Sequence, residues 1–156
     1  MEVCKKLYDR NPDIYYIFVK DIEKDLIVGY MNVMLVIEEY FKLFEEGKLF
    51  DLDIPDEAII VYDGLGVYKL CLISIAIYKE YQDSDVIKLL MYSFEGKLIK
   101  LAKKGIYFKE FLAEAISYDG EKFCRNLGMK QVNVTMNGSK IMKVDWRSIK
   151  DMNIVK

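Results

Sequence analysis

An apolar run from Leu70 to Ile77, broken only by Ser74, constrains this chain more than any other segment. It predicts a buried strand that starts at Val67 and lies centrally in its sheet, because such a run needs cover on both faces. A polar stretch follows, and then, from about Ser84 to Lys103, apolar residues at helical spacing. The segment predicts strand, turn and helix, an order that leaves free backbone N–H groups where a phosphate can bind.

The next segment extends this unit. Gly105 ends the helix, and the stretch from Ile106 to Ala115 is rich in apolar and aromatic residues, which predicts another strand. A strand, a helix and a second strand in this order predict that the two strands pair in parallel through a right-handed crossover.

Outside this unit the pattern predicts antiparallel hairpins and short helices. Strands over 14–20 and 26–36 form one hairpin, and the pair Asn137-Gly138 joins two more strands in a turn that favours positive φ. The other predicted elements are a helix over Glu2–Asp9 before a turn at 11–13, a helix over 38–46 before Gly47, a loop over 49–55 leading into 58–62, a turn over 63–66, a helix over 120–127 before Gly128, and strands over 130–136 and 139–144.

Length and apolar content indicate one domain. The 156 residues are 53% hydrophobic, which suffices for one core and is too little for two ordinary domains. The longest apolar run, over 26–37, is well below the roughly 20 residues needed to cross a bilayer, and the first residues lack a signal-peptide pattern. We therefore expect a single domain over 1–156, without a membrane span, in the cytoplasm.

The chain has no histidine and three widely spaced cysteines. The absence of histidine excludes Ser-His-Asp and Cys-His nucleophiles and histidine-based metal sites. Cys4, Cys71 and Cys124 lack the spacing of zinc sites or disulfide frameworks, so we expect reduced thiols, with Cys71 in the core. Acid–base chemistry must then come from other side chains, and the net charge of −2, without a basic block, argues against a nucleic-acid partner.

The order of these elements resembles the GNAT (Gcn5-related N-acetyltransferase) fold over residues 14 to 136. The motifs that carry the resemblance are the hairpin ending in Ile27-Val28-Gly29-Tyr30, the strand over 70–77, the turn Gln82-Asp83-Ser84-Asp85-Val86-Ile87 with its helix, and Phe123-Cys124-Arg125-Asn126-Leu127-Gly128-Met129. The resemblance implies an α/β (α+β) architecture, in which a mixed, mostly antiparallel twisted sheet carries helices on both faces. It also implies an acetyl-CoA-dependent N-acetyltransferase that uses no metal.

The resemblance implies that acetyl-CoA is held by the central strand and the turn after it. In the family the backbone amides of this turn bind the pyrophosphate. Here Gln82 matches the family pattern, whereas Asp85 and Ile87 stand where the glycines belong. As a helix N-cap Asp85 would contribute roughly 0.5–2 kcal/mol, but its charge would repel a pyrophosphate, a repulsion that Lys79 and Lys88 could offset. The implied cofactor-binding residues are Ile75, Ala76, Ile77, Gln82, Asp83, Ser84, Asp85, Val86 and Ile87.

Four residues are candidates for catalysis. Cys124 occupies the position of a family tyrosine that often protonates the departing thiolate, and Tyr107 and Tyr118 are the nearest phenols that could replace it. Tyr118, six residues before Cys124, is the better candidate of the two, although 12 tyrosines make a chance neighbour common. Glu110 and Glu114 are spaced by four on one strand, hence on one face, and are candidates for the general base. The structural alternative is a polar, solvent-facing strand surface.

Three functions remain open. The first is transfer of an acetyl group to a primary amine, on a small molecule or a protein, by direct attack within a ternary complex. The second is a GNAT-like ligand-binding or protein-interaction module without turnover, and the third is an interaction protein whose hairpin over 15–30 pairs with another chain. Because the family has a strand and two helices before the hairpin, we also expect an incomplete acceptor-side wall. Either a homodimer completes this wall, or the acceptor site is open and suited to a large substrate.

Overall fold

The structure is a computed structural model that describes residues 9–11, 16–49, 54–61 and 64–146. The predicted helix over Glu2–Asp9, the turn at 11–13, Cys4 and the start of the turn over 63–66 lie wholly or partly outside these ranges. None of the helices that the structure describes is long and apolar enough to cross a membrane.

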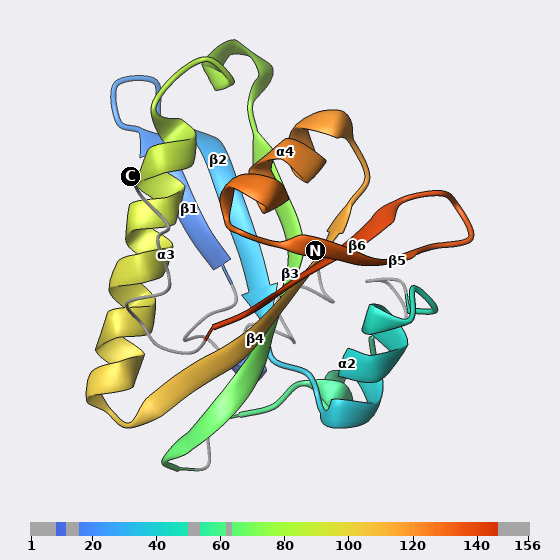
Figure 1. Cartoon of the computed structure of the whole chain (residues 1–156). Coiled ribbons are helices and arrows are strands. Elements are labelled where there is room, and N and C mark those ends of the chain that lie inside the picture. The colour runs from blue at the N-terminus through green and yellow to red at the C-terminus, as the bar shows by residue number, and fades with distance from the viewer. Residues whose placement is uncertain (1–8, 12–15, 50–53, 62–63, 147–156) are drawn as a thin grey trace.

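A six-stranded mixed sheet forms the centre of the protein (Figure 1). Its strand order is β1-β2-β3-β4-β6-β5, and every pairing is antiparallel except that of β3 with β4. The elements are β1 (Tyr16–Asp21), β2 (Leu26–Met34), α2 (Glu38–Glu45), the 3₁₀ turn η2 (Asp56–Ala58), β3 (Gly66–Ile77), the 3₁₀ turn η3 (Lys79–Tyr81), α3 (Val86–Lys103), β4 (Ile106–Ala115), α4 (Tyr118–Asn126), β5 (Lys130–Val134) and β6 (Lys140–Asp145).

The predicted fold class is confirmed, and the boundaries differ by a few residues. The parallel pairing of the strands over 67–77 and 106–115 is present, with β3 between β2 and β4. The main helix begins at Val86 rather than Ser84, and α4 begins at Tyr118 because the Ser117 hydroxyl accepts a hydrogen bond from the Gly120 N–H at 3.1 Å and so caps the helix. Of the segment over 58–62 the structure describes residues 58–61, and among these a single bridge joins Ile59 to Val36.

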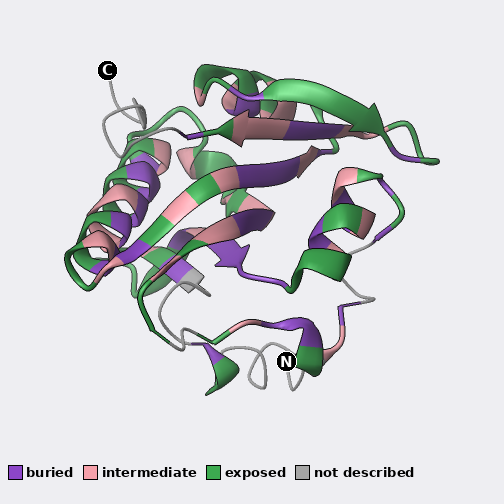
Figure 2. Ribbon diagram, turned by 60° about the horizontal axis from the view of Figure 1, so that its bottom comes forward, coloured by how far each residue is buried: buried purple, intermediate pink, exposed green. Residues whose placement is uncertain are grey.

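The helices cover both faces of the sheet and bury two separate cores (Figure 2). On one face α3 and α4 pack over Leu70, Leu72 and Phe111; on the other, α2 packs over Cys71 and Leu112. Each strand thus contributes alternate side chains to each core, as a sheet with two covered faces requires. The edge strand β5 is exposed along its whole length.

Gly29 allows the start of α3 to pack closely against β2. A Cβ at this position would lie 2.6 Å from Val86 Cγ1 and 3.4 Å from Leu90 Cδ1, the first of which is too short for any real contact. Both of those side chains are buried in the core beneath α3. The glycine therefore determines how near the first turn of the helix comes to the sheet.

We expect Gly29→Ala to lower the free energy of unfolding by about 1–3 kcal/mol, because the added methyl group overpacks the contact with Val86. Urea denaturation measures the change. Adding Val86→Ala should restore part of the loss by removing the clashing methyl groups. The matched control is Gly96→Ala inside α3, where a Cβ meets nothing within 4 Å and where alanine should stabilise the helix by up to about 1 kcal/mol. Equal stability of Gly29→Ala and wild type would contradict this account of the packing.

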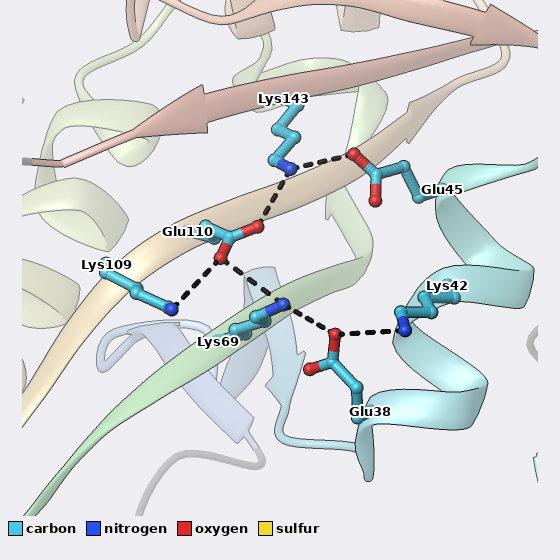
Figure 3. A network of polar contacts seen from close by, with 7 residues as sticks. All are labelled: Glu38, Lys42, Glu45, Lys69, Lys109, Glu110 and Lys143. Carbon is cyan, nitrogen blue, oxygen red and sulfur yellow. Dashed lines mark hydrogen bonds and ion pairs between the residues drawn. The ribbon is translucent and has the colours of Figure 1, made fainter.

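A network of ion pairs fastens α2 to the sheet (Figure 3). At its centre is Glu110 on β4, whose side chain is only 14% exposed. Lys143 Nζ lies 2.8 Å from Glu110 Oε2 and 2.7 Å from Glu45 Oε1, and Lys69 Nζ lies 3.3 Å from Glu110 Oε1 and 2.9 Å from Glu38 Oε1. Two lysines thus connect one strand carboxylate to two glutamates of the helix.

The same lysines also pack on an aromatic ring of α2. Lys69 Nζ lies 4.7 Å and Lys143 Nζ 6.0 Å from the centre of the buried Phe41 ring. Burial alone would raise the pKa of Glu110, but hydrogen bonds and charges from the two lysines outweigh it and leave the pKa below its ordinary value. Glu110 therefore stays ionised and acts as the anchor of α2.

Candidate functional site

The parallel strands β3 and β4 separate halfway along β3 (Figure 1). Their pairing runs from Gly66 with Ile106 to Leu72 with Ala113 and ends there, although β3 continues to Ile77. Over this last part β3 pairs only with β2, through Ile75, Ala76 and Ile77 among others. Among the described residues, the β3 backbone beyond Leu72 therefore has no strand partner on the side of β4.

A β-bulge in β3 coincides with this separation. Asn32 pairs with Ser74 and its neighbour Val33 pairs with Leu72, so Ile73 is an extra residue without a partner in β2. Consequently Leu72 and Ile75, three residues apart, both contact the core beneath α3, which a regular strand does not allow. Bulges bend a strand and end pairing, which explains why β3 leaves β4 at this point.

A cavity of about 280 Å³ lies at the separation, on the side of α2. Most of its lining is apolar and comes from β3, from the end of β4 and from α2 with the segment after it. The apolar lining residues are Phe44, Leu49, Ile54, Ile73, Ile75 and Ile116, and the others are Ser74, Glu114, Ser117 and Gly120. On this face of the sheet, α2 with Leu49 and Ile54 forms one wall of the cavity. The incomplete acceptor-side wall expected from the resemblance stays a prediction.

A second, more open cavity of about 600 Å³ adjoins the first. The two share Glu114, Ile116 and Ser117, so Glu114 lies where they meet. Tyr118, at 80% exposure, lines the second cavity together with residues of α4 and the β5–β6 turn. The structure thus places two predicted catalytic residues, Glu114 and Tyr118, on one cavity.

The Glu114 carboxylate is held by a short chain of hydroxyl groups. The Ser139 hydroxyl donates a hydrogen bond to Glu114 Oε1, and Thr135 Oγ1 lies 2.6 Å from Ser139 Oγ. With Ser139 donating to the carboxylate, Thr135 is the donor to Ser139. Neither hydroxyl was predicted as a site residue; the signal that points to them is the Asn137-Gly138 turn, which brings Thr135 and Ser139 together.

Glu110 and Cys124 lie apart from this arrangement. Glu110 lines neither cavity, and both of its carboxylate oxygens are engaged by lysines, so we do not retain it as a general base. Cys124 is 2% exposed and belongs to the core beneath α3 and α4. Burial raises the pKa of its thiol to about 11, so it stays protonated and out of contact with a ligand.

The turn between β3 and α3 forms without glycine. Asp25 is the only non-glycine residue with positive φ in the described ranges, so every residue from Gln82 to Ile87 keeps an ordinary backbone conformation. The Val86 N–H donates to the Ser84 hydroxyl at 3.4 Å, and Gln82 Nε2 to the Ile77 carbonyl at 3.5 Å. Aspartate and isoleucine at the glycine positions of the family pattern therefore cause no backbone strain here.

Asp85 does not cap the helix as predicted. It is the residue before α3, but its side chain accepts no capping hydrogen bond and instead pairs with Lys88, 2.7 Å from Asp85 Oδ1 to Nζ. The hydrogen bond to Asp85 raises the pKa of Lys88. The Asp85 carboxylate is thus paired with the nearest cation of the first helical turn. It caps none of the N–H groups of that turn, which have no partners within the helix.

Tyr81 fixes this turn to the β1–β2 hairpin. Its hydroxyl donates to Asp21 Oδ2 at 2.6 Å and accepts from Lys24 Nζ at 2.8 Å. The hydrogen bond from Tyr81 is the main reason why the pKa of Asp21 lies below its ordinary value. The start of α3 is therefore held from two sides, by Tyr81 in η3 and by the close contact at Gly29.

Solved structures similar to this one share its fold at low sequence identity. A bacterial toxin is 20% identical, with a TM-score of 0.55, over 92% of this chain and 73% of its own. AtaTR bound with AcCoA is 16% identical (TM-score 0.54, 92% and 76% covered), and a tyrosine-to-phenylalanine mutant of KacT is 18% identical (0.53, 96% and 80%). No family model and no curated protein matches the sequence. The matches and the strand order together show that this chain has the fold of the GNAT acetyltransferases.

Proposed function

We propose that this protein is an N-acetyltransferase that moves an acetyl group from acetyl-CoA to a primary amine within a ternary complex. The observation that carries the proposal is the open β3 edge beyond Leu72, which runs past a cavity with a carboxylate and ends at the start of a helix. Such an edge offers amide groups to an extended ligand, and a helix start offers N–H groups to a phosphate.

The residues present fit acetyl-CoA in part. Ile75, Ala76 and Ile77 would hold its amide-containing arm through their backbone, and the turn from Gln82 to Ile87 would hold its pyrophosphate. The unstrained backbone of the turn supports this assignment, whereas the Asp85 carboxylate weakens it. That the similar AtaTR was crystallised bound with AcCoA is further support. When bound, acetyl-CoA supplies the activated acyl group as a thioester.

The chain's own residues would then move the protons. Glu114 would take one proton from the acceptor ammonium, and the freed nitrogen would form the new N–C bond as the C–S bond of the thioester breaks. The departing thiolate would take a proton from Tyr118, the candidate at the same cavity in place of the buried Cys124, and the second proton lost by the attacking nitrogen would restore the phenol. Glu114 suits the base role because Ser139 fixes its orientation and no ion-pair partner is found for it among the described residues.

Calorimetric titration of the purified protein with acetyl-CoA and with CoA tests the proposal. Binding of both, together with thiol release in the presence of amines, is expected. Absence of binding at millimolar ligand would overturn it. Binding without turnover over a broad amine panel would favour the second candidate, a GNAT-like module without activity, for which the buried Cys124 in place of a tyrosine is the specific observation.

We expect Asp85→Asn to tighten the binding of CoA about two- to fivefold at low salt, because the change removes a negative charge beside the pyrophosphate and releases Lys88. The gain should shrink in 0.5 M NaCl (about a 4 Å Debye length). The matched control is Glu46→Gln, which removes the carboxylate of another exposed lysine pair, 2.8 Å from Lys48, and should leave binding unchanged. Unchanged or weaker binding by Asp85→Asn would show that the phosphates do not lie at this turn.

A further inference from the structure

We propose that the acceptor is a primary amine attached to an apolar body, alkyl or arylalkyl, which occupies the cavity beside α2. Glu114 binds its ammonium group, and Asn32 provides a second hydrogen-bond acceptor. This inference rests on the proposed function and names the substrate class of the same site.

The lining of the cavity selects for an apolar body. Six of its ten lining residues are aliphatic or aromatic, and they come from three separate parts of the chain. Phe44 and Leu49 are themselves part of the buried core beneath α2, so the cavity continues an apolar interior. A polyamine or a hydroxylated amine would lose hydration there without regaining hydrogen bonds.

Glu114 is the carboxylate whose charge is available for a ligand. Glu121, the other carboxylate that lines the two cavities, is engaged by a lysine and an arginine, and Glu110, on the same strand as Glu114, is engaged by Lys69 and Lys143. No ion pair to Glu114 is found within the described ranges, where the neutral Ser139 hydroxyl donates a hydrogen bond to its carboxylate. A partly buried carboxylate without a cation favours a cationic ligand.

Asn32 presents an unsatisfied acceptor on the same face. It is 5% exposed, and its Oδ1 accepts no hydrogen bond from the described residues. Asn32 is paired with Ser74, which lines the cavity, and side chains of paired residues lie on one face of a sheet. A buried amide oxygen without a hydrogen-bond donor lowers the stability of the fold. A ligand N–H that donates to Asn32 Oδ1 would satisfy this oxygen and explain why the asparagine is there.

Binding of simple amines to the protein tests the assignment. For the series from n-propylamine to n-hexylamine, measured by calorimetry, the affinity should rise about fourfold per methylene group, hence about 60-fold in all. Ethanolamine and 1,4-diaminobutane should bind no better than n-propylamine. A flat series, or preference for the diamine, would overturn the proposal.

Two variants test the polar contacts. Glu114→Gln and Asn32→Leu should each weaken n-hexylamine binding about tenfold or more, because the first removes the negative charge that faces the ammonium group and the second removes the amide oxygen that accepts its hydrogen bond. Asn32→Leu should also raise the thermal midpoint, since it removes the unsatisfied amide. The neutral 1-hexanol should bind both variants and wild type alike, which controls for damage to the cavity. Loss of 1-hexanol binding along with n-hexylamine in Glu114→Gln would count against the charge recognition.

Acetyl-CoA titrated in parallel separates the two claims. If acetyl-CoA binds but the amine series is flat, the acceptor class proposed here is wrong and the acetyltransferase proposal stands. If the amines follow the predicted order but neither acetyl-CoA nor CoA binds, the acetyltransferase proposal is wrong and the cavity is an amine-binding site.

Discussion

Replacing Glu114 with glutamine should lower kcat/KM for amine acetylation by about 10²- to 10⁴-fold near neutral pH, the usual effect of removing a general base. Glutamine keeps the size of the side chain and can still accept the Ser139 hydrogen bond, so the fold and the affinity for CoA should not change. Steady-state thiol release over pH 6–9, with calorimetry for CoA, measures the effect. Retention of more than about a tenth of the activity would exclude Glu114 as the base.

The same cavity provides the controls. Glu121→Gln removes a carboxylate already engaged by Arg125 and Lys140 and should reduce the rate only a few-fold. Ser139→Ala should give an intermediate loss of rate because Glu114 is no longer oriented, and Ser139→Thr, which keeps the hydroxyl, should recover the rate.

Tyr118→Phe should reduce turnover and leave CoA binding unchanged, because the phenol is the proposed acid. Unchanged turnover would exclude Tyr118 from that role.

Replacing Glu110 with glutamine should lower the free energy of unfolding at pH 7 by about 2 kcal/mol, because the partly buried Lys69 and Lys143 lose the carboxylate between them. Urea denaturation measures this. Glu38→Gln is the matched control: it belongs to the same network, but its side chain is 55% exposed, so the loss should stay below about 1 kcal/mol. Equal effects of the two changes would show that burial does not distinguish these pairs.

The effect of Glu110→Gln should depend on pH in a defined direction. The pKa of Glu110 is lowered in the folded protein, so its carboxylate stabilises the fold fully above the unfolded-state pKa of about 4.3. This contribution is lost as the pH falls through the lower, folded-state pKa. The difference between wild type and variant should thus be constant from pH 7 to about pH 5 and shrink at lower pH. A difference that grows on acidification would contradict the assigned shift.

The sequence predicted the order of elements because local signals carry it. Apolar periodicity marked β3 and α3, and Gly105 and Gly128, both with positive φ, mark the ends of α3 and α4. The strand, helix, strand order was enough to predict the parallel pair. Glu110 and Glu114 were correctly expected on one strand face, because that depends only on their spacing.

The partners of individual side chains could not be predicted from the sequence, because they depend on tertiary contacts. Whether a glutamate on that face meets lysines or a cavity depends on α2 and β6, which are distant in sequence from β4. Asp85 has the residue type of an N-cap, but the nearby lysine at position 88 competes for its carboxylate. The bulge at Ile73 leaves no mark on an apolar run, since both phases of the alternation are hydrophobic there.

That bulge divides β3 into two segments of opposite phase. Before Ile73 the even-numbered side chains, such as Leu72, face α3; after it the odd-numbered Ile75 does. Deleting Ile73 would restore one phase along the whole strand and remove the bend that separates it from β4. We expect such a shortened strand to continue its ladder with β4 and close the sheet, so that a single residue decides whether this fold has a ligand cleft.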